Sequence, residues 1–440
     1  MNAADGSVQQ EDNHWARMPI AELCEVIQGQ SPPGSTYNTA GEGLPFFQGK
    51  AEFGDLFPTA TKWCTAPKKI AEPGDVLISV RAPVGPTNLC RERSAIGRGL
   101  AALRSHEGIP SKYVLYALRA TQEELRAGAT GSTFEAINGS QLRSHEIALA
   151  PLEDREVIVS EIEKQFTRLD AGVASLRRVQ ANLKRYRAAV LQAAVTGRLV
   201  PTEAALARGE NGPVVSAENL LGNENVPESA LPANGSLPEG WVAAKFAEVA
   251  ERVTVGHVGP MKDEYRPTGM PFLRSQNVRE NRFDPAGLKY IDAAFHLKLK
   301  KSRILPGDLL IVRSGSVGTA CVLPDSIQEA NCADLVVVQG LWGILPKFAA
   351  YYMNSEAKAE VRAGQVGVAL THFNTKSVAR LQVPVPPMRE QTRIVAAVER
   401  HLSIIDELER EVTRGLRRGA NLRQAVLGTA FTGRLAGAGS

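Results

Sequence analysis

Two stretches of the chain repeat apolar residues every seven positions, and each stretch is free of proline for about 40 residues. In the first, from about Asp154 to Thr196, the heptad residues are Ile162, Leu169, Leu176, Leu183 and Val190. A second row, four positions later, contains Phe166, Val173 and Ala194, and is interrupted by Gln180 and Arg187. This pattern predicts a long helix with an apolar seam that packs against a helical partner.

The second stretch carries the same pattern near the end of the chain. Its two rows contain Val398, Ile405, Val412 and Val426, with Leu402, Leu416 and Ala430. Gly415 and Gly419 weaken this helix by about 1 kcal/mol each relative to alanine. We therefore expect packing against the partner helix to offset the glycines.

The two helices belong to an internal repeat. At a shift of 236 residues, AAVLQAAVTGRL (188–199) lies over QAVLGTAFTGRL (424–435), and eight of these twelve positions are identical. The shift becomes 233 where EPGDVLISVRAPVG (72–85) matches LPGDLLIVRSGSVG (305–318), and 226 where GLPF (43–46) matches GMPF (269–272). An ordered series of matches indicates two copies of one unit, roughly 15–199 and 241–435.

The part of each copy that precedes the long helix has the pattern of a mixed α/β globule. DVLISV (75–80), DLLIVR (308–313) and LVVVQ (335–339) are short apolar runs that predict strands, and the first two follow a Pro-Gly turn. Residues 111–128 and 346–364 predict matching helices, each ended by glycine. The fold class is therefore α/β (α+β) globules plus long helices, in two tandem repeats with pseudo-twofold symmetry.

The repeated TGRL predicts the end of each long helix, because Gly197 and Gly433 stand where a left-handed C′ residue would terminate it. The stretch between the copies is rich in Pro, Asn, Gly and Glu and predicts a linker with one short helix near Ala204–Arg208. The expected domains are an N-terminal tail (1–14), a first globule (15–152), a central long helix (153–199), the linker (200–240), a second globule (241–387), a C-terminal long helix (388–435) and a tail (436–440).

Composition and charge limit the classes of protein to which the chain can belong. The net charge is only +4, but basic residues gather toward the ends of both long helices while acids gather toward their starts. This sorting fits either a helix dipole with a solvated face or a basic end that faces phosphate or an acidic partner. The five cysteines form no C-x-x-C pair, the N-terminus lacks an apolar signal run, and the most apolar window is too short to span a bilayer. We expect a cytoplasmic protein.

Two globules, each followed by a helix of about 40 residues, suggest an assembly. If the helices pair antiparallel as a coiled coil, they form a rod on the order of 60 Å long with one globule at each end. B-DNA presents successive major grooves on one face every ~34 Å, so two such heads suit two half-sites with an unread gap.

The chain resembles the DNA-specificity subunit of a type I restriction–modification system. The resemblance rests on 131–163, on 367–399, on LPEGW (237–241) and on both TGRL stops. The helix entry PPMREQTRIV fits the family pattern closely, whereas the first copy, PLEDREVIV, has Arg-Glu instead of Glu-Gln. The resemblance implies two target-recognition domains that read a bipartite, asymmetric sequence in double-stranded DNA.

The resemblance also implies partners that carry the chemistry. Two adenine-methyltransferase subunits, which use S-adenosylmethionine, would dock on the paired helices, and motor–nuclease subunits, which use ATP and Mg, would join for restriction. The chain itself has no G-x-x-x-x-G-K-[ST], no H-E-x-x-H and no Asn-Pro-Pro-aromatic motif. We therefore expect no catalysis, no metal and no cofactor on this chain, and no membrane partner.

Candidate DNA contacts follow from residue type, since Arg favours guanine and Asn or Gln favours adenine in the major groove. In the first globule they are Gln48, Lys50, Arg81 and Arg98. In the second they are Arg274, Gln276, Asn277, Arg279, Arg282 and Arg313, with Lys300, Lys301 and Arg303 better suited to phosphates. Phe46, Phe47 and Phe272 are expected in the core.

Two other functions stay open on the sequence alone. PDSIQEAN (324–331) has a weak similarity to a nuclease carboxylate pair but lacks the following lysine, so a stand-alone DNA nuclease is one alternative. A non-catalytic coiled-coil adaptor that never meets DNA is the other. The diverged globules argue against the adaptor, because a spacer does not need them.

Overall fold

The computed structural model describes residues 15–129, 135–210, 237–357 and 374–432. The chain divides into two compact units. Unit 1 contains the residues up to Arg178 and those from Val412 onward, and unit 2 contains Val179–Glu411. Each unit therefore consists of one globule, called a head below, and part of both long helices, which differs from the consecutive domains expected from the sequence.

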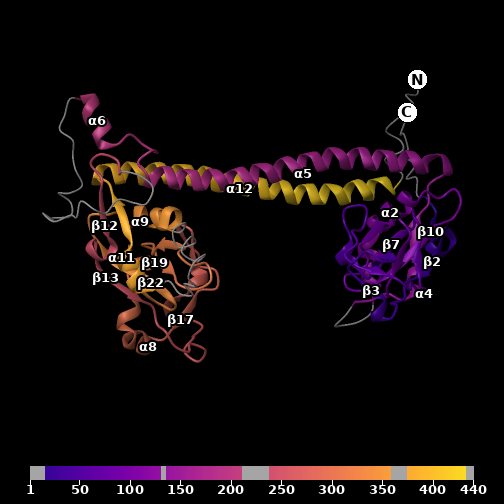
Figure 1. The fold of residues 1–440 in the computed structure, drawn as a ribbon, viewed down its shortest axis with the longest axis horizontal. Helices are drawn as coiled ribbons and strands as arrows, with labels where there is room; N and C mark the ends of the chain where they lie inside the picture. Colours follow the sequence, from indigo (N-terminus) through magenta and orange to yellow (C-terminus); the bar gives the residue numbers. More distant parts are fainter. Residues whose placement is uncertain (1–14, 130–134, 211–236, 358–373, 433–440) are drawn as a thin grey trace, which may run out of the picture. The chain divides into compact units, whose positions relative to one another are not determined.

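Head 1 is built on one two-stranded and two larger sheets (Figure 1). β1 (Arg17–Pro19) pairs with β11 (Glu146–Ala148). The second sheet has the order β2 (Cys24–Gln28), β10 (Leu100–Ser105), β7 (Val76–Ser79), β8 (Thr87–Leu89). The third has the order β3 (Tyr37–Asn38), β5 (Trp63–Cys64), β4 (Leu44–Phe47), β9 (Ser94–Ile96), β6 (Ile70–Ala71). Its helical elements are α1 (Ile20–Leu23), η1 (Gly34–Thr36), η2 (Lys50–Glu52), α2 (Ser111–Ala120), α3 (Gln122–Ala127) and α4 (Gly139–Ser144).

Head 2 repeats these sheets, except that its counterpart of the five-stranded sheet has four strands. β12 (Val242–Lys245) pairs with β23 (Gln382–Val385). The other sheets have the orders β13 (Ala250–Val255), β22 (Leu335–Leu341), β19 (Leu309–Val312), β20 (Ala320–Val322), and β17 (Lys289–Ile291), β14 (Met270–Leu273), β21 (Ala330–Cys332), β18 (Arg303–Ile304). A hairpin of β15 (Val278–Arg279) and β16 (Arg282–Phe283) is added. Its helical elements are η3 (Phe246–Glu248), η4 (Ser275–Asn277), α8 (Ala293–Lys298), η5 (Lys300–Ser302), α9 (Pro346–Tyr352), the π-helical η6 (Met353–Ala357) and α11 (Thr375–Arg380).

The predicted strands and turns are confirmed. DVLISV forms β7, DLLIVR forms β19 and LVVVQ forms most of β22. Gly74 and Gly307 have φ of 87° to 90°, the left-handed conformation that the Pro-Gly turns require. The equivalent strands pair in the same order in both heads, so the internal repeat is a repeat of structure.

The predicted head helices are only partly right. Residues 111–128 form two helices, because the helix ends at Ala120 and restarts at Gln122. The Thr121 hydroxyl donates to the Ala117 carbonyl and contacts the His145 ring, so this side chain turns inward at the break. The predicted helix at 346–364 changes to a π-helix at Met353, and residues from 358 lie outside the described part.

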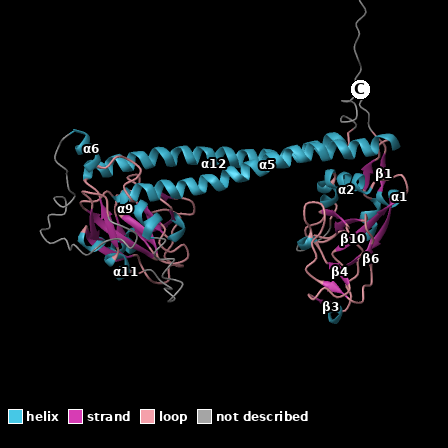
Figure 2. Ribbon diagram, turned by 45° about the horizontal axis from the view of Figure 1, so that its top comes forward, coloured by secondary structure: helices cyan, strands magenta, loops and turns pink. Residues whose placement is uncertain are grey.

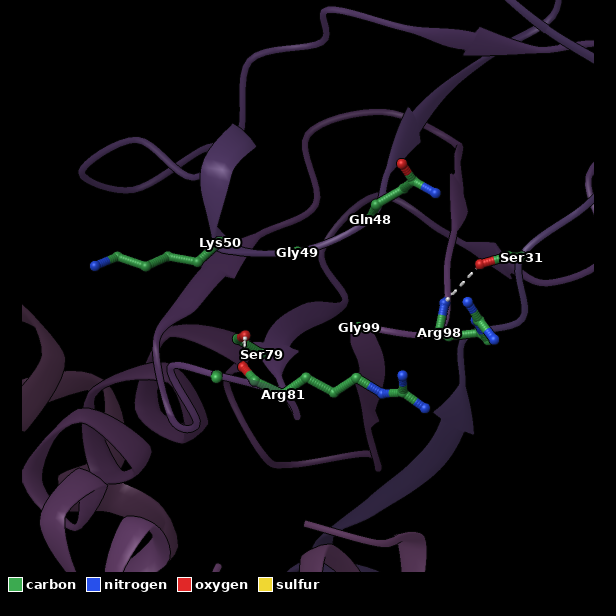
Figure 3. Close-up of a pocket in the computed structure, with 9 residues that line it drawn as sticks. Ser31, Gln48, Gly49, Lys50, Ser79, Arg81, Arg98 and Gly99 are labelled. Atoms are coloured by element: carbon green, nitrogen blue, oxygen red, sulfur yellow. Dashed lines mark hydrogen bonds between the residues drawn. The ribbon is translucent and has the colours of Figure 1, made fainter. Parts of the chain in front are cut away.

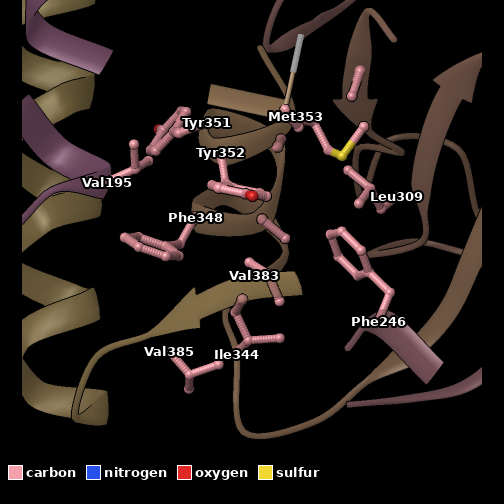
Figure 4. Packing of buried hydrophobic residues seen from close by; sticks show 14 of the residues in the cluster. Val195, Phe246, Leu309, Ile344, Phe348, Tyr351, Tyr352, Met353, Val383 and Val385 are labelled. Atoms are coloured by element: carbon pink, nitrogen blue, oxygen red, sulfur yellow. The ribbon is translucent and has the colours of Figure 1, made fainter. Parts of the chain in front are cut away.

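In each head a helix lies between a four-stranded sheet and the long helices: α2 against β7, β8 and β10 in head 1, and α9 against β19 and β20 in head 2 (Figures 1 and 2). In unit 1, Tyr113 and Tyr116 of α2 share a buried cluster with Ile162 and Phe166. In unit 2, α9 shares a cluster with residues from both long helices: Val190, Leu191, Ala194, Val195, Ile394 and Val398. Figure 4 shows Val195 beside the aromatic side chains of α9. Each head is therefore joined to its helix segments through one continuous apolar core.

The long helices are α5 (Leu152–Val195) and α12 (Met388–Ala430). They are slightly shorter than the expected 153–199 and 388–435, and Gly433 lies outside the described residues. Gly197 is left-handed, with φ of 69°, and the Arg198 N–H donates to the Ala193 carbonyl at 2.8 Å. These are the features of a Schellman cap, so the first TGRL is a helix stop as predicted. The expected short helix in the linker is α6 (Glu203–Glu210).

The predicted seam is buried along both helices. Of the heptad positions in α5, only Gln180 is exposed. In α12, every residue at alternating steps of four and three from Val398 to Ala430 is buried or half-buried. In unit 1 a Cβ at Gly415 would meet Leu176, and one at Gly419 would meet Val173, so the segments run antiparallel there. The glycines allow a close approach between the two backbones.

The same ion pair occurs in both units. Arg423 pairs with Asp170 in unit 1, and Arg187 pairs with Asp406 in unit 2. The repeat shift of 236 converts Arg187 into Arg423 and Asp170 into Asp406, so each copy supplies the arginine to one pair and the aspartate to the other. The contact is therefore reciprocal, as in a twofold dimer. The neighbours differ, since Arg423 lies 4.4 Å from the Phe166 ring and Arg187 also contacts Glu409 at 3.1 Å.

The hydrogen bonds at the starts of α5 and α12 also match, although the residues that make them differ. Gln391 donates to two backbone carbonyls at 2.8 and 2.9 Å. The shift of 236 places Asp154-Arg155 over Glu390-Gln391, one position earlier than the Arg-Glu expected from the sequence. Arg155, at the position equivalent to Gln391, donates to the corresponding two carbonyls at 2.9 and 2.8 Å. The acceptors are Pro386 and Ala150 before the helix, and Gly343 and Gly108 in the head. The departure of PLEDREVIV from the family pattern thus preserves the contact that the glutamine makes.

A substitution in α12 separates helix propensity from packing. Gly428 has no atom within 4 Å of a built Cβ, so Gly428→Ala should raise the stability of the helix by about 0.5–1 kcal/mol. Gly419→Ala should gain less or lose stability, because its Cβ would lie 3.0 Å from Val173 Cγ2. Thermal unfolding followed by circular dichroism measures both. Equal gains would contradict the close approach at Gly419.

No helix in the described ranges combines the length and the apolar character needed to cross a membrane.

Candidate nucleic-acid interface

Head 1 gathers the four predicted contact residues around one cavity. The cavity has a volume of about 340 Å³. Its lining comprises Gln48, Lys50, Arg81 and Arg98, together with Ser31, Ser79, Gly49, Ala82 and Gly99 (Figure 3). The four predicted residues, which span 50 positions in the sequence from Gln48 to Arg98, therefore lie at one place.

The sheet explains this convergence. Gln48 follows β4 and Arg98 follows β9, and these two strands are parallel neighbours, so their carboxyl ends meet at the same edge. The chain then crosses very close to itself, since a Cβ built at Gly99 would lie 2.1 Å from the Gln48 carbonyl oxygen. Phe46 and Phe47, which precede Gln48, are buried in the core as predicted.

The cations of this cavity are not paired with carboxylates in the described part of the chain, although the Glu52 carboxylate lies nearby and accepts from the Gly49 N–H at 3.2 Å. Within the described ranges, no carboxylate forms an ion pair with Lys50, Arg81 or Arg98, whereas Arg104 of the same head is paired with Asp75. Figure 3 shows Arg81 and Arg98 extending toward the same side of the cavity, while Lys50 extends away from it. Exposed cations without counterions favour a polyanionic ligand such as DNA.

Ser31 and Ser79 belong to the site but were missed in the sequence. Ser31 Oγ accepts a hydrogen bond from the Arg98 backbone N–H at 3.3 Å, and Ser79 Oγ donates to the Arg81 carbonyl at 3.0 Å. Both hydroxyls therefore hold the backbone beneath the two arginines. A serine has no pattern that would have marked it, because the role depends on long-range loop packing.

Head 2 uses the equivalent segment differently. Arg274 and Gln276 donate to the Gly287 carbonyl at 2.7 and 3.3 Å, so both side chains bind the following loop. Asn277 is fully buried, and its side-chain amide donates to the carbonyl groups of Asp284 and Ala286. The hydrogen-bonding groups of Asn277 are therefore used inside the turn, which does not support its prediction as a DNA contact.

The β15–β16 hairpin carries the two arginines of this segment that point outward. Arg279 and Arg282 are both exposed and stand opposite each other in the hairpin. Arg279 Nε donates to Asp284 Oδ2 at 3.2 Å, a bond that does not use the two terminal nitrogens that would meet a guanine. The Ala286 N–H, and then Arg279, hold the pKa of Asp284 below its ordinary value, so the carboxylate stays charged beside the arginine.

The remaining candidates of head 2 lie on other elements. Lys300 and Lys301 are exposed on η5. Arg303 is engaged by Glu329 at 2.5 Å, and the same carboxylate contacts the buried His296 ring at 2.7 Å. Arg313 follows β19 as Arg81 follows β7, but it is half-buried and its Nε has no hydrogen-bond partner among the described residues. These residues lie on η5, on β18 and after β19.

Features of metal or thiol chemistry are not found in the described ranges. No group of three or more His, Cys, Asp or Glu side chains is placed there to hold a metal ion. All five cysteines are buried and free. Burial raises the pKa of Cys24 and Cys90 to about 11, which keeps these thiols protonated and unreactive at neutral pH.

Comparison with known proteins identifies the family. A model described as "Type I restriction modification DNA specificity domain" matches residues 13–176 and 238–417. A Methanocaldococcus jannaschii protein named as the MjaX type I restriction enzyme specificity subunit is 36% identical over 190 residues, 43% of this chain and 44% of that one. The EcoBI type I restriction enzyme specificity subunit of Escherichia coli is 22% identical over 427 residues, 96% of this chain and 86% of that one.

Solved structures share the fold. A chain from a type I R-M system superimposes with a TM-score of 0.69 at 18% identity, covering 96% of this chain and 98% of that one. The HsdS subunit from Thermoanaerobacter tengcongensis gives a TM-score of 0.53 at 18% identity, with 96% and 97% covered. Because the family model matches both copies of the repeat, this chain belongs to the DNA-specificity subunits of type I restriction–modification systems.

Proposed function

We propose that the chain reads a bipartite, asymmetric target in double-stranded DNA, with one half-site for each head. The observation that carries this proposal is that two heads with the same sheets present different polar side chains after the equivalent strands β4 and β14. Head 1 offers an open cavity with unpaired cations, and head 2 offers an arginine hairpin. Different surfaces on equal scaffolds suit two different half-sequences.

The long helices would set the distance between the half-sites. We propose that they pair as an antiparallel coiled coil, which the buried heptad seam and the reciprocal Arg–Asp pairs support. A helix of 44 residues is about 66 Å long, enough to separate two heads by more than the ~34 Å between successive major grooves.

Catalysis would come from partner chains. We propose that two adenine-methyltransferase subunits dock on the paired helices and that motor–nuclease subunits join for restriction, so that S-adenosylmethionine, ATP and Mg are bound by those partners. The helix faces outside the seam are exposed and basic in α5, where Arg177, Arg178, Lys184 and Arg185 are all accessible. Such a face can meet an acidic partner surface or the DNA itself.

The test is to map methylated adenines in a host that carries this chain with its methyltransferase partner. Two short sequences separated by a fixed gap would support the proposal. Methylation at a continuous site would contradict the bipartite target. DNA cleavage by the purified chain alone with a divalent metal would favour the nuclease, and absence of any sequence preference in the presence of the methyltransferase would favour the adaptor.

Arg279 offers a prediction within one half-site. Arg279→Ala should reduce discrimination at one base of the half-site read by head 2, by about 1–3 kcal/mol, while the other half-site is unchanged. Binding to single-base variants of the target, measured over a range of salt concentrations, checks it. Arg380, exposed at the end of α11, provides the charge-matched control Arg380→Ala. An equal loss on all sequences with a shallower salt slope would assign Arg279 to the DNA backbone.

A further inference from the structure

In head 2 the buried side chain of Asn354 connects the β15–β16 hairpin to β20, the edge strand of the sheet β13-β22-β19-β20. Asn354 Oδ1 accepts from the Ala320 N–H at 3.0 Å, and its Nδ2 lies 2.8 Å from the Ala320 carbonyl oxygen. The same Nδ2 donates to Asn281 Oδ1 at 2.7 Å. Asn354 therefore joins β20 to the turn between β15 and β16, and it is only 8% exposed.

The Asn281 turn is held at two points. Asn281 has a left-handed backbone, with φ of 60°, and its N–H donates to the Ala320 carbonyl at 2.9 Å. A non-glycine residue in this conformation is uncommon and depends on its surroundings. The positions of Arg279 and Arg282, on either side of the turn, thus depend on contacts with β20 and Asn354.

Head 1 contains the same arrangement made from different residues. Arg119, at the end of α2, contacts Thr87 of β8 through Nε at 3.2 Å and donates to the Thr87 carbonyl at 2.9 Å. Its guanidinium also donates to the Asp55 carbonyl at 2.8 Å. Asp55 lies in the segment that follows Lys50 of the cavity, so this arginine fastens that segment to the edge strand.

The two arrangements occupy equivalent positions of the repeat. The shift of 233 places Thr87 over Ala320, and the shift of 226 places Asp55 over Asn281. The matching helices α2 and α9, aligned at Ser111 and Pro346, place Arg119 over Asn354. The three residue types differ at all three positions, yet the same three places are connected. We call Arg119 and Asn354 the clamp residues.

Each clamp residue extends from a helix that is anchored in the core. Phe348 and Tyr351 of α9 are buried with long-helix residues in unit 2 (Figure 4), and Tyr113 and Tyr116 of α2 are buried with long-helix residues in unit 1. The helix α9 ends at Tyr352 and continues as the π-helical η6, which contains Asn354 itself, and such π-turns are frequent at functional positions. The clamp therefore connects the segment after β4 or β14 to the element that packs on the long helices.

We propose that Arg119 and Asn354 are positioning residues for sequence reading, each acting on the half-site of its own head. The proposal rests on the proposed function, since it presupposes that the heads read DNA. Neither side chain contacts DNA. Each holds the segment that follows β4 in head 1, or β14 in head 2, in a fixed position against the edge strand of the sheet. Loosening the segment lets Arg279 and Arg282 of head 2, or Lys50 of head 1, adopt several positions relative to the base edges.

The test uses the complete chain with its methyltransferase partner and compares discrimination at both half-sites. Asn354→Ala should reduce discrimination against single-base changes on the order of tenfold at one half-site and leave the other unchanged. Arg119→Lys keeps the charge but loses the forked geometry of the guanidinium. It should reduce discrimination at the other half-site and leave the half-site affected by Asn354→Ala unchanged. Each variant is therefore the control for the other, and total affinity at low salt should change little.

A milder variant guards against misfolding. Asn281→Gly keeps the left-handed backbone and removes only the acceptor of the Asn354 bond, so it should affect the same half-site as Asn354→Ala. The double variant should be no worse than Asn354→Ala alone, because both changes remove one contact. Head 2 variants that keep full discrimination, or that weaken both half-sites equally, would overturn the proposal. Failure of the unmodified chain to specify a bipartite site would instead overturn the proposed function.

Discussion

Gly99→Ala is expected to lower the stability of unit 1 by about 3 kcal/mol and to deform the cavity of head 1. The added Cβ would lie 2.1 Å from the Gln48 carbonyl oxygen, a backbone atom that cannot turn away as a side chain can. The loop that carries Arg98 must then move away from β4. Overpacking of this kind is strongly destabilising, because a packed interior has no free space to accept the atom.

The measurement is thermal unfolding, together with binding to targets altered in either half-site. Gly49 also lines the cavity, and a Cβ there would meet nothing within 4 Å, so Gly49→Ala is the matched control. We expect the control to unfold like the parent and Gly99→Ala to lose discrimination at one half-site only. A Gly99→Ala chain with unchanged melting temperature and unchanged discrimination would show that the close crossing is not needed.

Trp241→Phe is expected to destabilise unit 2 by about 1–3 kcal/mol. The Trp241 indole donates to Glu390 Oε1 at 2.9 Å, and the other oxygen accepts from the Glu203 N–H at 2.9 Å. Glu390 is fully buried at the start of α12. Phenylalanine fills most of the space but leaves a buried carboxylate oxygen without its donor. Trp342, which is 42% exposed, provides the control Trp342→Phe, with an expected change within about 0.5 kcal/mol.

The loss of stability caused by Trp241→Phe should depend on pH. Burial raises the pKa of Glu390, and the hydrogen bonds from Glu203 and Trp241 oppose this rise. A carboxyl group with a raised pKa in the folded state binds its proton before the unfolded chain does, so protonation adds stability as pH falls through the raised value. Losing the indole raises the pKa further, because the charged form loses a donor. The deficit of Trp241→Phe should therefore shrink as the pH is lowered from neutral toward the ordinary glutamate range. A deficit that is constant with pH would mean that packing alone is lost.

Periodic features could be predicted from the sequence because they depend on local geometry. The heptad residues from Ile162 to Val190 are buried or half-buried in the structure, and the helix stop at Gly197 has the left-handed backbone that its position implied. The repeat itself was visible because the two copies preserve positions that pack or turn. Such features require only spacing and a few residue types.

The candidate site could be predicted only in part. The four residues of the head 1 cavity were chosen by type and do converge, because they follow strand ends that share an edge. Asn277 has the same chemistry as a base reader, but its buried turn uses the amide internally. The equivalence of Arg119 and Asn354 was invisible, because their identities differ and only the contacts to Asp55 and Asn281 reveal it. Long-range partners decide such roles, and a local pattern does not contain them.

The reciprocal Arg–Asp pairs have a consequence for how the two halves can change over time. In a true homodimer one mutation alters both symmetric contacts at once, so a harmful change at the aspartate would be felt twice. Here Asp170 pairs with Arg423, and Asp406 pairs with Arg187, so one pair can change while its counterpart keeps its residues. Glu409 beside Arg187, where Val173 stands in the other copy, shows that such separate drift has already occurred.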